Sequence, residues 1–406
     1  MEQYTGILGI IVLLSISFLL SNNRSLVDKN IIFWGLGLQF SFAFIILKTS
    51  FGEKLFFYFN IFIVKLISFA DAGSDFLFTS FIPEVGYDQA LLNFAFRALP
   101  VIIFFSSLIA VTYHLGIIQF VIKNISLLME KTMKTSGAET LSISANIFVG
   151  QTEAPILIRP YISLMTKSEL MAVMVGGFAT VAGSVMALYV TWLNNIPDIA
   201  GHLLAASVMS APAALMVAKI IYPETKALKT INSNKIKLKS NDNNIVDAVG
   251  RGATEGLKLA ANVAAMLIAF ISMVAMINFV LGLLGTSMQE ILGLLFKPLA
   301  WTMGIPWKDA EIVGTLMGEK IVLTELIAFR DLSDYVTKNI LSERSIIITS
   351  YALCGFANFG SIGIQLGGIG SMAPERKKDL SRIVFKAMLG GAIASWLTAS
   401  IVGIII

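Results

Sequence analysis

A polar stretch at residues 146–155 interrupts a chain that is otherwise strongly apolar. Within it, Gln151, Thr152 and Glu153 offer an amide, a hydroxyl and a carboxylate, a set that can donate to and accept from the edge of a heterocycle. A carboxylate at bilayer depth costs roughly 2.5–3.5 kcal/mol, and non-helical backbone survives there only under protein or beside a water-filled cavity. A glycine and a proline mark the expected break in the helix. The stretch is therefore predicted to be the tip of a re-entrant helical hairpin; the alternative is an aqueous loop between two spans.

A second polar stretch, residues 318–325 (GEKIVLTE), is also acidic and flanked by apolar segments. Its Glu325, together with Asn358 and Ser361, supplies acceptors and donors suited to the hydroxyls of a sugar. Each polar group also has a structural interpretation. Glu325 could form an ion pair with Lys320, Asn358 and Ser361 could join helices to one another, and the acidic and amide groups of the first hairpin could cap its tip.

Four oxygen-bearing groups lie near two expected backbone breaks. Carbonyl groups freed at broken helices coordinate Na⁺ in many transporters, so these groups are candidate ligands of a sodium ion. In the alternative, a proton-coupled protein needs no such site, and Glu153 or Glu325 carries the proton. The candidate sodium ligands are Asn146, the carbonyl of Val149, Thr180 and Ser184.

The composition excludes several classes of protein. Of 406 residues, 56% are hydrophobic and 14% charged, against about 25% charged in soluble domains, and the mean hydropathy is +0.79. One cysteine and two histidines exclude an intrachain disulfide and a cysteine- or histidine-rich metal cluster. Basic cytoplasmic loops account for the net charge of +4 without a nucleic-acid partner. With no Ser–His or Asp–His pair near the hairpins, an intramembrane enzyme is also disfavoured.

The apolar segments predict an all-α, polytopic membrane protein, because a span needs about 20 apolar residues. Three shorter amphipathic segments, 51–68, 116–134 and 286–298, are predicted to be interfacial helices. The eight predicted spans are 4–21, 31–48, 91–115, 170–193, 203–222, 255–283, 346–370 and 383–406.

The chain also contains a disguised internal repeat. Residues 177–185 (GFATVAGSV) resemble residues 355–362 (GFANFGSI), and each follows a polar hairpin candidate. Because three spans or half-spans separate the two units, they should have opposite membrane topology. Paired interrupted helices of this kind indicate a transport site near the membrane midplane; the alternative is a chance likeness of two Gly-rich helix-packing segments.

Several of these stretches resemble motifs of the concentrative nucleoside transporters, in the order in which that family has them. The most specific is VGQTEAP at 149–155, followed by IRPY at 158–161. One departure lies at hairpin two, where the family pattern is Gly-x-Lys-x-x-x-Asn-Glu-Phe. This sequence has Thr324 in place of the Asn and Leu326 in place of the Phe, so the resemblance assigns no ligand role to Thr324. The other matching stretches are GLGLQF at 35–40, FADAG at 69–73, TSGAE at 135–139, ASVMSAPA at 206–213 and CGFANF at 354–359.

The resemblance implies a secondary transporter, not an enzyme, that imports nucleosides with Na⁺ by alternating access; proton coupling, a passive channel or an intramembrane enzyme are the alternatives. It implies a multi-pass homotrimer in the bacterial cytoplasmic (inner) membrane, with no cofactor beyond Na⁺ as coupling ion. Small residues at the tip and at position 185 imply that uridine and adenosine both fit. The implied contacts are Gly150, Gln151, Thr152, Glu153 and Val185 to the nucleobase, Glu325, Phe356, Asn358 and Ser361 to the ribose, and the four candidate ligands above to Na⁺.

The predicted organisation has five parts. Two transport repeats, each with a hairpin, a broken helix and a final span, alternate with parts of a scaffold. The parts are scaffold and interfacial helices at 1–135, the first transport repeat at 136–224, a cytoplasmic loop at 225–250, a scaffold and an interfacial helix at 251–307, and the second transport repeat at 308–406.

Overall fold

The computed structural model of this chain describes residues 2–79, 94–226 and 242–406. These ranges contain helices and no strand, so the predicted all-α class is confirmed. The start of the predicted span 91–115 and most of the predicted loop 225–250 lie outside the described residues.

Seven helices of the described chain are long and apolar enough to cross a membrane, against eight predicted spans. Six of the seven correspond to predicted spans. Predicted span 4–21 is the shorter helix α1 (Glu2–Leu19), and predicted span 346–370 is divided by a break. The seven are Lys29–Lys48, Ser50–Phe78, Ala95–His114, Lys167–Trp192, Ile199–Ile221, Ile245–Gly282 and Pro374–Ile405.

The seventh is a segment that the sequence predicted to be interfacial. Residues 51–68 belong to α3 (Ser50–Phe78), which begins directly after α2 (Lys29–Lys48). Lys65 lies within this helix, with its ammonium 5.1 Å from the centre of the Phe69 ring. A long lysine side chain can keep its charge accessible while its stem covers apolar surface. The regularly spaced lysines in 51–68 therefore did not prevent a helix long enough to cross a membrane, and the prediction of an interfacial helix was wrong. The other two predicted interfacial segments correspond to α5 (Ile117–Met133) and α13 (Met288–Thr302).

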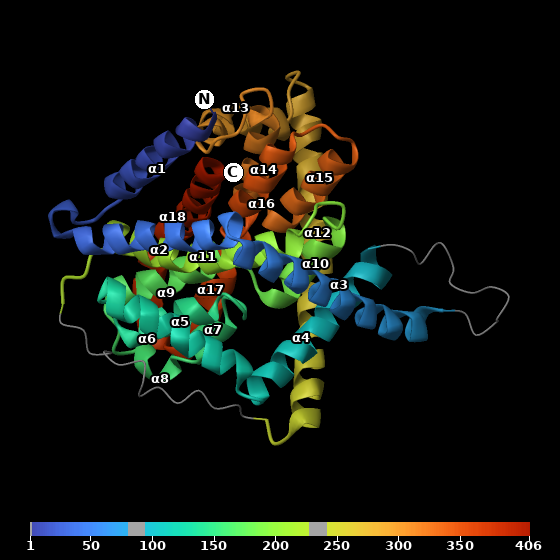
Figure 1. Cartoon of the computed structure of the whole chain (residues 1–406), viewed down its shortest axis with the longest axis horizontal. Helices are drawn as coiled ribbons and strands as arrows, with labels where there is room; N and C mark the ends of the chain where they lie inside the picture. The colour runs from blue at the N-terminus through green and yellow to red at the C-terminus, as the bar shows by residue number, and fades with distance from the viewer. Residues whose placement is uncertain (1, 80–93, 227–241) are drawn as a thin grey trace.

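Two long helices pack tightly along one side of the molecule, α4 (Leu99–His114) and α12 (Ile245–Gly282). Two glycines of α12, four residues apart, allow this contact. A Cβ atom on Gly252 would lie 2.6 Å from the Cα of Ser107, and one on Gly256 would lie 2.7 Å from the Cα of Ile103. Small residues at this spacing let membrane helices approach backbone to backbone. In Figure 1, α12 runs through the height of the molecule, with α4 beside its lower half.

The two predicted repeats appear as two matching series of elements. Hairpin one is followed by a broken helix and a long helix, and hairpin two by the same order; Figure 1 has α6 to α8 in the lower half of the view and α14 to α16 in the upper half. The first series is α6 (Gly137–Ala145), α7 (Glu153–Ile156), α8 (Arg159–Ile162), α9 (Lys167–Ala179), α10 (Gly183–Trp192) and α11 (Ile199–Ile221). The second is α14 (Ala310–Val322), α15 (Glu325–Thr337), α16 (Glu343–Leu353), α17 (Phe359–Met372) and α18 (Lys377–Ile405).

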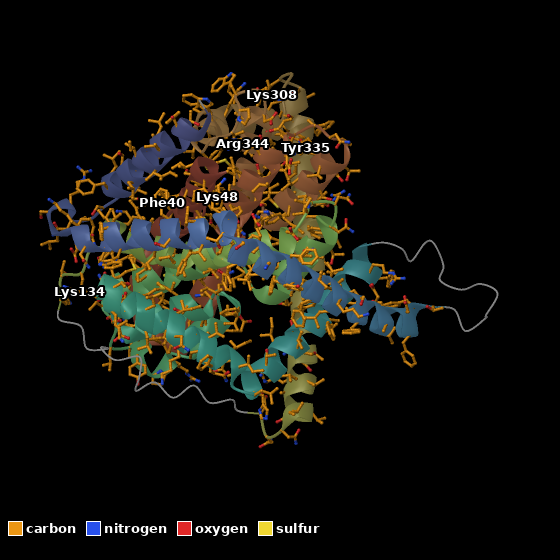
Figure 2. All side chains as sticks on the ribbon, viewed as in Figure 1. Phe40, Lys48, Lys134, Lys308, Tyr335 and Arg344 are labelled. Carbon is orange, nitrogen blue, oxygen red and sulfur yellow. The ribbon has the colours of Figure 1, made fainter. Side chains whose placement is uncertain are left out.

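Charged and polar side chains mark the periphery of both halves. Lys308, Arg344 and Tyr335 lie in the upper part of the view, around the base of hairpin two, and Lys134 lies at the outer edge of the lower part (Figure 2). Two lysines are instead buried within the protein. Lys219 forms an ion pair of 2.7 Å with Glu139 at the start of hairpin one, and Lys320 donates to the carbonyls of Ala352 (2.9 Å) and Cys354 (3.3 Å).

The two broken helices meet at their breaks. Gly355 has φ +122°, and a Cβ atom there would lie 2.8 Å from backbone atoms of both Phe178 and Ala179. The tip of hairpin one joins the same region, because the amide of Gly183 donates to the carbonyl of Phe148 over 3.0 Å. Polar backbone freed by the breaks is thus gathered at one place inside the protein, where it escapes contact with lipid.

This crossing predicts that Gly355 tolerates no side chain. Gly355→Ala should lower the free energy of unfolding by at least about 1–3 kcal/mol, the cost of an L-residue held in a glycine-only conformation, because the added methyl group also meets fixed backbone. The measurement is thermal unfolding of the purified chain in detergent.

Gly363→Ala is the matched control, since it lies in α17 and its added Cβ has nothing within 4 Å. Equal unfolding temperatures for the two variants would contradict this account of the crossing.

Candidate functional site

A cavity of about 450 Å³ lies where the two hairpin tips and the two breaks converge. Hairpin one contributes Phe148 to Glu153, hairpin two contributes Thr324 to Leu326, and the breaks contribute residues on both sides. The helices α4 and α12 complete the wall with mostly apolar side chains. Of the thirteen residues predicted from the sequence, eleven line this cavity: Val149, Gly150, Gln151, Thr152, Glu153, Ser184, Val185, Glu325, Phe356, Asn358 and Ser361.

Glu325 is the buried carboxylate at the hairpin-two side of the cavity. Its Oε2 accepts from Asn358 Nδ2 over 2.8 Å, and its Oε1 accepts from the hydroxyl of Tyr189 over 3.0 Å. Tyr189 is itself held by stacking on Phe329, with ring centres 4.2 Å apart. The alternative ion pair with Lys320 is not formed, because that ammonium donates to the α16–α17 break instead.

Asn358 has a second task at the start of α17. Its Oδ1 accepts from the backbone amide of Ser361 over 2.8 Å, which satisfies one of the free amides at a helix N-terminus. The same side chain therefore ends the break and orients Glu325. Asn358 can therefore cap a helix and line the cavity at the same time, because its oxygen binds the Ser361 amide and its nitrogen binds Glu325.

The amide of Gln151 links the two halves of the site. Its Nε2 donates to Ser361 Oγ over 3.1 Å, and its Oε1 accepts from Gln365 Nε2 over 3.0 Å. Gln365 is fully buried and also donates to the carbonyl of Met174 over 3.1 Å. Gln151, predicted to face the nucleobase, is thus hydrogen-bonded to Ser361, predicted to face the ribose. Its amide is used in contacts with the second broken helix and does not cap the hairpin tip.

The remaining cavity residues of hairpin one form a small group at its tip. Glu153 is exposed to the cavity and accepts from the hydroxyl of Thr152 over 3.1 Å. A Cβ atom on Gly150 would collide with the Glu153 carboxylate. Glycine at this position therefore leaves room both for that carboxylate and for a ligand.

The candidate sodium ligands divide into two pairs. Val149 and Ser184 line the cavity, whereas Asn146 and Thr180 are buried beside the breaks. Asn146 donates through Nδ2 to the carbonyl of Ser142 (3.1 Å), and its buried Oδ1 has no hydrogen-bond partner among the described residues. Thr180 donates its hydroxyl hydrogen to the carbonyl of Gly176 (2.9 Å), which leaves the oxygen lone pairs free. Unpartnered oxygens of this kind fit a hard monovalent cation.

Several residues of the site were missed by the sequence analysis. Tyr189 is an aromatic residue in an apolar span, and its sequence carried no signal for a role beside Glu325. Gln365 did carry one, because an amide within an otherwise apolar span is costly unless paired. Ser106, Tyr113, Arg251 and Glu255 line the cavity from α4 and α12, and only the tertiary contact between these helices and the hairpins reveals them.

Thr324, where the resembling family has Asn, acts as a helix cap. Its hydroxyl oxygen accepts from the amides of Leu326 (3.1 Å) and Ile327 (3.4 Å) at the start of α15. Leu326, which replaces Phe, lines the cavity wall. The substitution at 324 thus preserves the capping function, since Asn and Thr are both favoured at this position.

Comparison with known proteins identifies the family. Three family models match the chain: the N-terminal model of the Na⁺ dependent nucleoside transporters at residues 8–81, their C-terminal model at 202–403, and a nucleoside recognition model at 95–195. Among curated proteins, Uncharacterized transporter YutK of Bacillus subtilis is 41% identical over 414 residues, covering the whole of both chains. The chain belongs to the Na⁺ dependent nucleoside transporter family.

Mammalian relatives and solved structures extend the match. Sodium/nucleoside cotransporter 1 is 42% identical in rat and 40% in human, and the present chain spans 64% of the length of each. CNTnw in an inward-facing, substrate-bound state has a TM-score of 0.91 and 40% identity, with 99% of this chain and 98% of that chain covered. A doubly substituted CNTnw in an outward-facing state matches with a TM-score of 0.91 at 39% identity. The relatives are named as transporters and not as enzymes.

The cap at the start of α15 predicts a measurable contribution from Thr324 in this member of the family. Thr324→Ala should lower the free energy of unfolding by about 0.5–2 kcal/mol, because two backbone amides lose their acceptor. Thr324→Asn should leave stability nearly unchanged, since an Asn side chain accepts from the same amides. Thermal unfolding of both variants decides the point, and an equal loss from both substitutions would refute the capping role.

Proposed function

We propose that this protein imports nucleosides, driven by a Na⁺ gradient, through alternating access. The observation that carries the proposal is the convergence of both hairpin tips on one cavity. That cavity presents a carboxylate and an amide from one half, Glu325 and Asn358, and an amide from the other, Gln151. Its volume of about 450 Å³ lies within the range of small-molecule sites, about 300–1,000 Å³.

The two sides of the cavity suit the two parts of a nucleoside. Glu325 accepts hydrogen bonds and Asn358 and Ser361 both donate and accept, which fits the hydroxyls of a ribose. Gln151, Thr152 and Glu153 fit the polar edge of a base, with Val185 as an apolar wall of modest size and Phe356 alongside the sugar. On binding, the sugar and base would replace the Gln151–Ser361 hydrogen bond with contacts of their own.

Na⁺ is proposed to bind between the breaks, at Asn146, the Val149 carbonyl, Thr180 and Ser184. The unpartnered oxygen of Asn146 supports this assignment, and so does the hydrogen bond from the Gly183 amide to the Phe148 carbonyl, which holds the tip of hairpin one against the α9–α10 break. The family description names Na⁺, and the proton-coupled alternative has no comparable support. One Na⁺ entering down 100 mV supplies about 2.3 kcal/mol and a tenfold gradient about 1.4 kcal/mol. Together they support roughly several-hundred-fold accumulation of substrate.

In the proposed mechanism, the two repeats at 136–224 and 308–406 move as a loaded unit against scaffold helices from 1–135 and 251–307. The existence of inward-facing and outward-facing structures of a relative supports such a movement. We further propose that the protein acts as a homotrimer in a bacterial cytoplasmic membrane, which native mass spectrometry from membranes would test.

The direct test is uptake of labelled uridine into proteoliposomes that contain the purified chain. We expect accumulation that requires an inward Na⁺ gradient and that an ionophore abolishes. Adenosine should compete, because Gly150 and Val185 leave room for a purine, whereas free uracil should compete poorly because it lacks the ribose contacts. Equilibration without accumulation would indicate a channel, and no inhibition by millimolar adenosine would indicate a pyrimidine-restricted site.

Glu325→Gln should weaken uridine affinity about 10- to 100-fold, because a hydrogen bond to a charged group is worth about 1.5–3 kcal/mol. Tyr189→Phe removes the hydroxyl that orients Glu325 and should cause a smaller loss in the same direction. Affinities are measured with uridine and with its 2′,3′-dideoxy analogue. If Glu325 binds the ribose, both substitutions should affect the analogue less than uridine. Equal losses for the two ligands, in protein that still folds and inserts, would contradict the ribose role.

Asn146→Ala and Thr180→Val should raise the Na⁺ concentration for half-maximal uptake, because each removes one proposed oxygen ligand. Thr191→Val is the matched control, since Thr191 also donates to a carbonyl four residues earlier but lies away from the breaks. A Na⁺ dependence that is identical in all three variants would refute the proposed site. Uptake that ignores Na⁺ and follows an imposed pH gradient would refute sodium coupling itself.

A further inference from the structure

A buried lysine joins two helices of the first repeat at their starts. Lys219, in the last turn of α11, has its ammonium 2.7 Å from Glu139 Oε2 and donates to Ser168 Oγ over 3.0 Å. Glu139 is the third residue of α6, and Ser168 is the second residue of α9. One charge therefore connects the start of hairpin one with the start of the first broken helix.

The two partners of this ammonium are themselves held in place. The other oxygen of Glu139 accepts from the backbone amide of Ser136 over 2.9 Å, within the capping box of α6. The hydroxyl of Ser168 donates to the carbonyl of Tyr222 over 2.7 Å, at the end of α11. The side chains of Lys219 and Glu139 are 4% and 0% exposed. Each group of the cluster thus has a fixed position inside the protein.

Both helices end at residues proposed to bind Na⁺. The C-cap of α6 is Asn146, and the C-cap of α9 is Thr180. One turn before these ends the helices pack closely, since a Cβ atom on Gly176 of α9 would lie 2.7 Å from Cγ1 of Ile143 on α6. The two helices therefore run in the same direction, from the lysine to the breaks. Their C-terminal ends carry partial negative charge, which favours a cation there.

A buried ion pair is poorly suited to stabilising a fold, because the cost of taking two charges out of water offsets their attraction. Its better-attested use is to fix the alignment of two elements. A shift of α6 along its axis by one residue would move its C-cap by about 1.5 Å, enough to break an oxygen–cation contact. An ion pair at the start of so short a helix opposes that shift.

We propose that Lys219 is a positioning residue that sets the register of α6 against α9. It thereby sets the distance between the oxygens of Asn146 and Thr180 and the affinity for Na⁺. The effect on Na⁺ rests on the proposed function, whereas the register of the two helices does not.

The test variant combines Lys219→Met with Glu139→Gln, so that neither charge is left buried without its partner. Methionine is an unbranched apolar residue that fills the space of the lysine stem. The new amide oxygen at position 139 can still accept from the Ser136 amide, which preserves the capping box. Glu224, 3.7 Å from the ammonium, is partly exposed and accepts from the hydroxyl of Thr166 over 2.7 Å. The double variant should therefore fold.

The matched control combines Lys297→Met with Glu311→Gln. This pair is also a lysine and a glutamate 2.7 Å apart, but it joins α13 to α14, away from the first repeat. A third variant, Ser168→Ala, keeps the ion pair of Lys219 and removes only its contact with α9.

The first measurement needs neither Na⁺ nor transport. Amide hydrogen exchange of the purified full chain in detergent, with choline in place of Na⁺, is followed in peptides that cover α6. We expect α6 to exchange about tenfold faster in the double variant, because a segment held by fewer contacts opens more often. The control should exchange at the rate of the unchanged protein. Equal exchange of α6 in the double variant and the unchanged protein would overturn the proposal.

The second measurement reports Na⁺ binding through thermal unfolding at constant ionic strength. A ion that binds only the folded protein raises the unfolding temperature with its concentration. The double variant should need about tenfold more Na⁺ for the same rise, the lower end of the loss seen when a group that orients a metal ligand is removed. Ser168→Ala should shift the requirement less and in the same direction, and the control should not shift it. The KM for uridine at saturating Na⁺ should stay nearly the same in all variants.

The two measurements separate this proposal from the proposed function. Faster exchange of α6 in the double variant, with no Na⁺-dependent stabilisation even of the unchanged protein, would refute the Na⁺ site and leave the register role intact. Faster exchange with an unchanged Na⁺ requirement would overturn the role of Lys219 toward Na⁺. A requirement that rises equally in the double variant and the control would assign both pairs to stability alone and overturn the proposal. If the double variant does not fold, an unchanged Na⁺ requirement in Ser168→Ala would overturn it.

Discussion

The close approach of the two broken helices is the constraint on which the rest of the structure depends. Gly355 meets the backbone of Phe178 and Ala179 at a distance that excludes any side chain. Because the helices touch at their interruptions, the carbonyl and amide groups that each break leaves free are held inside protein and not in lipid. The cavity forms on one side of this crossing, and the breaks supply its polar groups together with the two hairpin tips and the helices α4 and α12.

Several polar side chains serve both the breaks and the cavity. Asn358 caps α17 and orients Glu325, and Lys320 satisfies carbonyls of the α16–α17 break. In an apolar medium an unpaired polar group is costly, so each interruption needs partners from another element. This requirement ties hairpin one to the second broken helix through Gln151, Ser361 and Gln365. A ligand that enters the cavity would therefore act on both halves at once, as the proposed alternating access requires.

Hairpin two carries a second polar system that is separate from the cavity. Asn278 of α12 donates to the side chain of Gln289 on α13, and Thr315 of α14 donates to the backbone carbonyl of Gln289. At the start of hairpin one, Lys219 and Glu139 form a buried ion pair, whereas these contacts of hairpin two are hydrogen bonds between neutral groups. The two hairpins share a topology but differ in the polar contacts that hold them to neighbouring helices.

The sequence by itself determined the all-α membrane class, the two polar hairpins, the internal repeat and the cavity residues at the hairpin-one tip and the two breaks. Those features follow from local chemistry, because a polar residue or a glycine in an apolar span needs a specific reason to be there. The sequence did not determine the length of α3, since lysines within a helix extend their charges to its surface without ending it.

Only the tertiary structure decided which polar groups meet. The pairing of Glu325 with Tyr189, the turning of Lys320 away from Glu325, and the contributions of α4 and α12 to the cavity wall depend on contacts between distant segments. Such pairings carry no sequence signal, because an amide or a carboxylate has several chemically acceptable partners and the crossing of the helices selects among them.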